Sequence, residues 1–160
     1  MMMKHRKIID RTLEVFLVAI LGLLVFDVLW QVASRYLLSD PSEFTDEAAG
    51  FLLMWVSLLG AAYVTGKKQH MAINLLERKL KGNAKKSLSV FINFIIMMFT
   101  VFVFITGGTW LVYTRLHLGQ TSPSLGLPLG YVYLVLPVSG LFILYYSVDN
   151  TLKELSGNTQ

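Results

Sequence analysis

One stretch of the chain, from Glu43 to Asn74, constrains its fold more than any other. It reads EFTDEAAGFLLMWVSLLGAAYVTGKKQHMAIN: an acidic cluster, eighteen uncharged residues from Ala48 to Thr65, then a basic pair and a lone histidine. A helix rises ~1.5 Å per residue, so this uncharged run is about as long as the hydrocarbon core of a bilayer is thick. The stretch therefore predicts a membrane crossing with acids on one side and bases on the other.

Charged residues are scarce and clustered along the rest of the chain. They make up 15% of its 160 residues, whereas 54% are hydrophobic, and a soluble domain carries roughly 25% charged residues. No charge falls between Ser87 and Thr114, or between Leu118 and Val148. These long apolar gaps indicate an all-α membrane protein.

We expect four membrane spans in one domain that covers residues 1–160. Their approximate bounds are 13–38, 48–65, 88–113 and 131–148. The first apolar run follows a basic N-terminus but lacks a small-residue cleavage site, so we interpret it as a retained helix rather than a signal peptide. Pro137 is expected to bend the fourth span because proline removes one backbone donor.

The distribution of Lys and Arg predicts the direction of the crossings. Twelve of the fourteen basic residues lie in the N-terminal segment, between the second and third spans, or in the C-terminal tail. Since cytoplasmic loops carry the excess of these residues, we expect both termini inside. Residues 71–81 are too polar to span, and their spacing predicts a short amphipathic helix in the cytoplasmic interface, near phospholipid head groups; a solvated loop is the alternative.

Polar side chains inside or beside the expected spans need partners. An intramembrane charge is costly, and for Asp27 we favour a structural role near the outer boundary over a proton or ion relay. Asn93 is expected to form a hydrogen bond with another helix. Arg35 is expected to form a structural ion pair, rather than a substrate clamp, with nearby acids at the outer interface. Those acids are Asp40, Glu43, Asp46 and Glu47.

One face of the second span is built mostly from small residues, which permit another helix to approach closely. That face carries Gly50, Met54, Ser57, Ala61 and Val64.

Several classes of chemistry are excluded by the sequence. The chain has no cysteine, which rules out disulfides, thiolate metal sites and a cysteine nucleophile. By the expected topology its three histidines lie on both sides of the membrane and cannot pair on a haem. No catalytic triad, phosphate loop or zinc spacing is visible. We therefore expect no enzyme activity, no cofactor, no metal and no nucleic-acid partner.

Taken together, these residues resemble the small membrane subunit (the DctQ-like or Q subunit) of tripartite ATP-independent periplasmic (TRAP) transporters, over nearly the whole chain. Asp46 replaces the usual first glutamate, and Asn74 stands where an aspartate is common, which puts any ion pair made by that aspartate in doubt. The matching positions are Arg35-Tyr36, Asp46-Glu47, Trp55, Leu59-Gly60-Ala61-Ala62, Lys67-Lys68, His70, Asn74, the loop SPSLGLPLG and Pro137.

The resemblance implies a subunit of the bacterial inner membrane that transports nothing by itself. A large membrane subunit would carry the substrate and sodium sites, and a periplasmic binding protein would deliver an organic acid of the C4-dicarboxylate or sialic acid type. This chain would brace the large subunit and offer part of the docking surface. The contacts implied by the family match are Arg35, Asp46, Glu47, Trp55, Gly60, His70, Asn74 and Pro137.

Two other functions compete with this interpretation. A small multidrug exporter also has four spans and an acid in the first, here Glu14 or Asp27, that exchanges protons for cationic drugs. Such exporters have very short loops, which the basic segment from Lys67 to Lys86 does not match. A membrane anchor for another complex, such as a respiratory enzyme, is the second, but the unpaired histidines count against a haem-bearing anchor.

Overall fold

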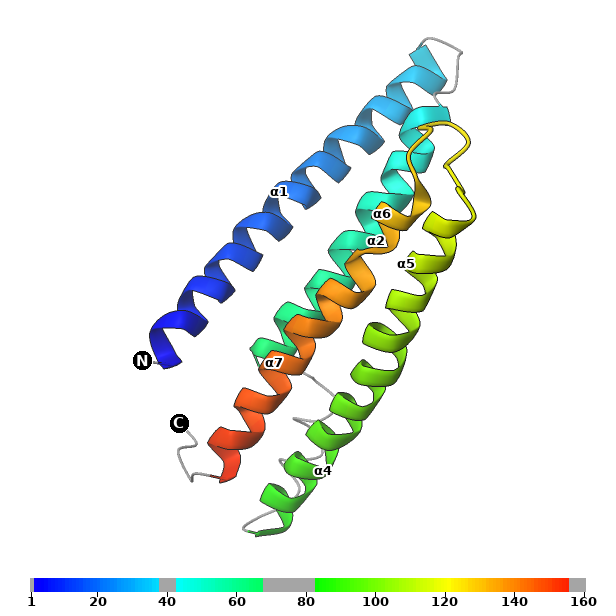
Figure 1. Cartoon of the computed structure of the whole chain (residues 1–160). Helices are drawn as coiled ribbons and strands as arrows, with labels where there is room; N and C mark the ends of the chain where they lie inside the picture. Colours follow the sequence, from blue (N-terminus) through cyan, green and yellow to red (C-terminus); the bar gives the residue numbers. More distant parts are fainter. Residues whose placement is uncertain (1, 38–42, 68–82, 156–160) are drawn as a thin grey trace. The chain divides into compact units, whose positions relative to one another are not determined.

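The chain is almost entirely helical in the computed structural model, which describes residues 2–37, 43–67 and 83–155 (Figure 1). The third crossing is made of three consecutive helices and the fourth of two. In chain order the helices are α1 (Met2–Leu37), α2 (Glu43–Gly66), α4 (Asn83–Phe99), η1 (Thr100–Gly107), α5 (Gly108–His117), α6 (Leu129–Tyr133) and α7 (Val135–Leu155).

Four helical stretches in this structure are long and apolar enough to cross a membrane. Their bounds are Arg6–Leu37, Glu43–Gly66, Ser87–His117 and Leu129–Leu152. The prediction of an all-α membrane protein with four spanning helices is confirmed. Each stretch continues past at least one end of the expected apolar segment, because polar residues at the membrane surface extend a helix without interrupting its hydrogen bonds. The amphipathic helix expected over residues 71–81 lies outside the described residues.

The helices contribute to two compact units. Unit 1 comprises Met1–Gly60 and Trp110–Val135, and unit 2 comprises Ala61–Thr109 and Leu136–Gln160. The buried hydrophobic side chains of unit 1 include Leu13, Ile20, Leu59, Val112, Val132 and Val135.

Small and polar residues supply much of the buried interior of unit 2. The hydroxyl-bearing residues Thr65, Thr100, Ser139 and Ser147 are all buried there, beside Ala62, Ile143 and the fully buried Tyr146. Asn150 Nδ2 donates a hydrogen bond of 3.0 Å to the carbonyl oxygen of Thr65. This composition is typical of membrane helices, which lack a hydrophobic force between them and associate through small residues and polar contacts.

The third crossing contains a π-helical segment, η1, which the sequence did not indicate. Thr106 Oγ1 donates to the carbonyl oxygen of Val101, five residues earlier, at 2.9 Å. At the start of the segment, buried Thr100 donates to Ile96, four residues earlier, at 2.7 Å. A hydroxyl bonded to a preceding turn competes with the backbone ladder and loosens a helix, so these two threonines favour the change in winding.

The fourth crossing is interrupted at Leu134, between α6 and α7. Pro137 explains the position of the break. It has no N–H to donate to the carbonyl oxygen of Tyr133, four residues earlier, and its ring crowds that same carbonyl. Accordingly α6 ends at Tyr133, and the Leu134 N–H bonds to the Tyr131 carbonyl oxygen at 3.3 Å instead.

Glycines bring the helices of unit 2 into close contact. A Cβ added to Gly108 would lie 2.9 Å from Leu136 Cβ and 3.1 Å from Pro137 Cδ. One added to Gly140 would lie 2.8 Å from Phe104 Cβ. These distances leave no room for a side chain, so α7 packs directly on η1 and the start of α5 only because both positions are glycine.

Candidate docking site at the loop end of unit 1

The polar contacts of unit 1 gather at its loop end, by which we mean residues 118–129 together with the first two turns of α2. In Figure 1 the loop, drawn in yellow, lies beside the start of α2, drawn in cyan.

The loop begins with a defined helix end. The Gly119 N–H bonds to the Leu116 carbonyl oxygen at 3.1 Å, and the Gln120 N–H bonds to the Arg115 carbonyl oxygen at 3.1 Å. This pair of bonds is the Schellman motif, which requires a left-handed residue just after the helix. Gly119 supplies it with φ of 60°. The chain therefore leaves α5 in one fixed direction.

The rest of the loop is a tight turn closed by backbone hydrogen bonds. The Ser122 N–H donates to the Leu127 carbonyl oxygen at 2.8 Å, and the Gly126 N–H donates to the Ser122 carbonyl oxygen at 3.0 Å. Thr121 and Pro128 face each other in an antiparallel bridge. The sequence SPSLGLPLG, rich in glycine and proline, thus forms an ordered turn with Pro123, Ser124 and Leu127 exposed.

Glu47 on α2 binds the tip of this turn, and we call this interaction the Glu47–loop contact. Its Oε2 atom accepts hydrogen bonds from the N–H groups of Ser124, at 2.9 Å, and Leu125, at 3.0 Å. Hydrogen bonds to a charged acceptor are roughly twice as strong as neutral ones. One carboxylate therefore fixes the turn through two amides that lie 77 and 78 residues further along the chain.

A second polar group supports the base of the same loop. Arg115 Nη1 donates a hydrogen bond to Gln120 Oε1. The guanidinium of Arg115 also lies over the ring of Tyr133, 5.7 Å from its centroid, within the range of a cation–π interaction. Arg115 thereby connects the end of α5 to α6. Arg115 is one of the two basic residues expected outside, and charge alone did not predict this role, because its partners are a neutral amide and an aromatic ring.

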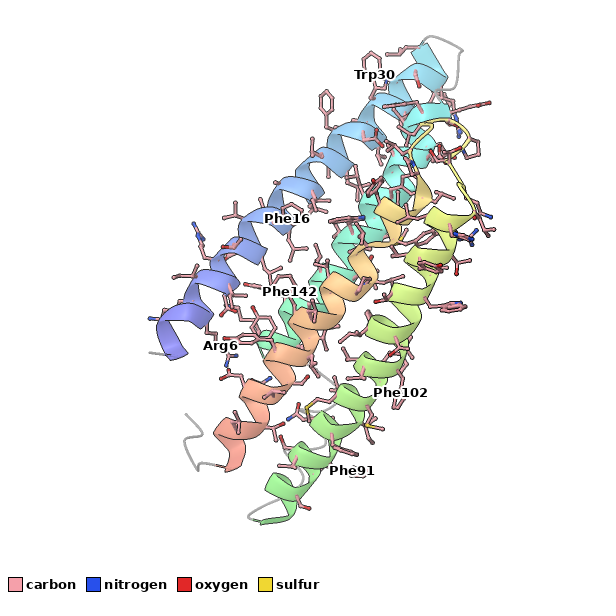
Figure 2. All side chains as sticks on the ribbon, in the orientation of Figure 1. Arg6, Phe16, Trp30, Phe91, Phe102 and Phe142 are labelled. Carbon is pink, nitrogen blue, oxygen red and sulfur yellow. The ribbon has the colours of Figure 1, made fainter. Side chains whose placement is uncertain are left out.

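Trp55 connects α2 to α6 and α1. Its Nε1 atom donates to the Val132 carbonyl oxygen at 3.0 Å, and the centroids of its ring and the Phe16 ring are 6.3 Å apart. Figure 2 labels Phe16 on α1. A half-buried tryptophan that satisfies its N–H in this way contributes both packing area and a directional bond.

Arg35 and the neighbouring acids are not arranged as expected. Gln31 Nε2, not Arg35, donates a hydrogen bond to Asp46 Oδ1, at 2.7 Å. Glu47 accepts its hydrogen bonds from the loop amides. Arg35 is exposed, and within the described residues it forms no ion pair with Glu43, Asp46 or Glu47. Asp40 lies outside those residues. Neutral and backbone donors occupy Asp46 and Glu47, two of the acids that charge alone would assign to Arg35.

The two intramembrane polar residues also have distinct surroundings. Asp27 is half-buried on α1, and its Oδ2 atom is buried with no hydrogen-bond partner in the described part of the chain. Asn93 is half-buried on α4 and forms no hydrogen bond with another described residue. The helix contact expected of Asn93 is thus not made within the described chain.

The small-residue face of α2 is largely open. Gly50, Ser57 and Ala61 are exposed, and a Cβ added to Gly50 or to Gly60 would meet nothing within 4 Å. The side of α2 that packs inside the chain carries Leu59, Ala62 and Thr65 instead. His70 and Asn74 lie outside the described residues.

The loop end combines an ordered turn with exposed side chains. Over the residues that the structure describes, no three metal-binding side chains come together. What the loop end provides is an ordered turn, an exposed leucine and two polar contacts that fix them to α2 and α6.

Comparisons with known proteins show the family of the chain. Residues 24–157 match the family described as tripartite ATP-independent periplasmic transporters, DctQ component. The chain is 28% identical to the sialic acid TRAP transporter small permease protein of Vibrio cholerae serotype O1, covering 95% of this chain and 88% of the relative. It is also 28% identical to a TRAP transporter small permease protein of Haemophilus influenzae, covering 89% of this chain and 87% of the relative.

The family match spans most of the chain, including three of its four spanning helices in full. Four apolar helices and relatives of this kind make it a multi-pass protein of the inner membrane. The chain belongs to the DctQ family of TRAP transporters, and it is a transporter component rather than an enzyme.

Proposed function

We propose that this chain braces the large transport subunit of a TRAP transporter and presents its loop end to the periplasmic binding protein. The Glu47–loop contact carries this proposal. It holds an exposed turn in one conformation, and a surface that is ordered before binding loses less entropy when a partner docks. The complex would catalyse sodium-coupled uptake of an organic acid.

The Vibrio cholerae relative is named for sialic acid, which favours a sialic acid over a C4-dicarboxylate as the transported substrate. The substrate and sodium sites would lie on the large subunit, so this chain would set assembly and docking rather than substrate choice.

Three family-matched residues would act by fixing the helices of unit 1, and others by contacting a partner. Asp46, Glu47 and Trp55 already hold polar partners within the chain. Arg35 and Gly60 are available to a neighbouring subunit, since Arg35 is exposed and Gly60 has open space at its Cβ position. We propose the same partner-facing role for His70 and Asn74, and a structural role for Pro137.

We infer that the N- and C-termini are cytoplasmic and the loop end periplasmic. This follows from the excess of Lys and Arg in the segments expected inside, where the basic residues between the second and third spans would lie near phospholipid head groups. Because the chain has no cysteine, single substitutions report accessibility cleanly. In intact cells a membrane-impermeant thiol reagent should label Ser124→Cys and spare Lys7→Cys; the reverse pattern would overturn the orientation.

Reconstitution tests the main proposal. Proteoliposomes that contain the large subunit, this chain and the binding protein should take up the organic acid along a sodium gradient, whereas this chain alone should transport nothing. Glu47→Ala should raise the concentration of binding protein needed for half-maximal uptake, because the turn is no longer held. Proton-for-cation exchange by the chain alone would instead support the small multidrug exporter and refute our proposal.

A further inference from the structure

A cleft of about 490 Å³ opens on unit 1 between α1 and the start of α2. Its walls are mostly apolar and aromatic, and Figure 2 labels one of them, Trp30. The lining residues are Leu23, Phe26, Asp27, Trp30, Phe44, Thr45 and Leu52. Asp27 is the one ionisable group among them.

The carboxylate of Asp27 is incompletely satisfied. Its Oδ2 atom is buried and accepts no hydrogen bond from the chain as described. The nearest amide side chain on the same helix, that of Gln31 one turn further on, donates to Asp46 instead. A buried carboxylate oxygen without a donor is unfavourable in any apolar surrounding and more so inside a membrane. The described chain supplies no donor for this oxygen.

We propose that the cleft receives a Lys or Arg side chain from a membrane helix of the large transport subunit, with the cationic group on Asp27. This inference rests on the proposed function, because it requires that subunit as partner. The long stem of either side chain is apolar and suits the walls, while its charged end suits the single carboxylate. The aromatic rings of Phe26, Trp30 and Phe44 add faces on which a cation is stabilised.

The first span has room for a helix to lie along it. Of the most apolar 18-residue stretch of the first span, only 6% is buried within the chain, whereas the corresponding share for the fourth span is 39%. Beside the cleft, Phe26 is 70% exposed and Leu23 is 59% exposed. A bare apolar surface is equally suited to lipid, and it is the charge of Asp27 at the cleft that favours a cationic protein side chain.

Photocrosslinking locates the occupant. With p-benzoylphenylalanine in place of Phe26, the assembled complex should yield a covalent adduct with the large subunit upon irradiation. The same probe in place of Val25, which is 53% exposed but points away from the cleft on α1, should yield at least fivefold less. An adduct with phospholipid alone at position 26, or equal yields at the two positions, would overturn the inference.

Replacing the carboxylate tests the charge. Asp27→Leu should raise the dissociation constant of the complex at least about thirtyfold, as expected when one partner of a buried ion pair is lost. The melting temperature of the isolated chain should stay the same or rise, because an unsatisfied carboxylate has been removed. Glu43→Gln, which removes an exposed acid at the start of α2, should change the dissociation constant less than threefold. An unchanged dissociation constant for Asp27→Leu would contradict the proposal.

Two further measurements separate the possible failures. If Asp27→Leu lowers the melting temperature of the isolated chain, Asp27→Asn takes its place; it should reduce the position 26 adduct at least fivefold, and an undiminished adduct overturns the inference. If the wild-type chain does not bind the large subunit at all, the proposed function itself is wrong. If the wild type binds but Asp27 variants bind equally well, only the assignment of this cleft is wrong.

Discussion

At the loop end of unit 1, side chains form hydrogen bonds with residues 15 to 78 positions away in the sequence, whereas in unit 2 helix α7 meets η1 and the start of α5 where a side chain is missing. Glu47 and Trp55 hold the loop and α6 by directional bonds. Gly108 and Gly140 instead let α7 lie close against its neighbours because neither has a side chain.

The difference separates two kinds of specificity. A carboxylate or an indole N–H fixes both the position and the orientation of its partner, which suits a surface that another protein must recognise. Glycine contacts fix only the distance between helices and rely on shape, which suits an interior surrounded by lipid. The comparison predicts that the loop end tolerates changes of size better than changes of polarity, and that the contact of α7 with η1 tolerates changes of polarity better than changes of size.

Adding bulk in unit 2 should have the largest effect. Gly140→Leu places a side chain where Phe104 already lies, and should lower the free energy of unfolding by about 3 kcal/mol, measured by denaturant titration in detergent micelles. Gly22→Leu on α1 is the control, since nothing lies within 4 Å of its Cβ position; it should change stability by less than about 1 kcal/mol. Equal losses for the two would show that shape does not set the packing of unit 2.

Weakening the Glu47–loop contact comes next. Glu47→Gln removes the charge that accepts two amide hydrogen bonds and should cost about 1.5 kcal/mol of local stability. Hydrogen exchange at the amides of Ser124 and Leu125 should accelerate about tenfold, while exchange in α5 stays the same. Glu43→Gln should leave both rates unaltered. If neither rate responds to Glu47→Gln, the turn is held by its own backbone bonds.

Removing the indole donor of Trp55 should have a smaller effect. Trp55→Phe keeps an aromatic ring but loses the hydrogen bond to Val132, for an expected loss of about 1 kcal/mol in thermal or chemical unfolding. Trp110→Phe is the matched control, because Trp110 is 69% exposed, and it should be neutral. A neutral Trp55→Phe would remove one of the directional bonds on which the comparison rests.

The smallest effect is expected at the helix break. Pro137→Ala restores a donor opposite the Tyr133 carbonyl oxygen and should change stability by less than about 1 kcal/mol, because the gained bond offsets lost contact with Gly108. The new amide at position 137 should be protected from hydrogen exchange. In Pro123→Ala, where the loop residue is exposed, the new amide should exchange quickly. Rapid exchange at both positions would mean that the break has another cause.

The sequence was sufficient to predict the four spans, because long uncharged runs have few alternatives to crossing a membrane. It also singled out Asp46, Glu47 and Trp55, yet it could not name what they bind. Their partners are a neutral glutamine and backbone groups up to 78 residues away, and such partners carry no charge or motif that a sequence displays. For the same reason the acids matched with Arg35 include Asp46 and Glu47, which other donors occupy.

The packing of unit 2 could not be predicted from the sequence, for a different reason. Gly108 and Gly140 look like any glycines in an apolar run, and nothing in TVFVFITG distinguishes a π-helix from an α-helix in composition. Their roles depend on how two distant segments meet. The small face of α2 was visible, but it is open in this chain, so a small-residue pattern identifies a helix that can pack without identifying its partner.

The π-helical segment also affects how relatives of this chain are to be aligned. A π-helix has more residues in each turn than an α-helix does. It therefore accommodates an insertion within the third crossing without forming a loop. Residues before Thr100 and after Gly107 that seem to share a face on a regular helical wheel therefore point in different directions. A relative with a regular α-helix here should be shorter within this stretch, and its alignment gap belongs inside the membrane.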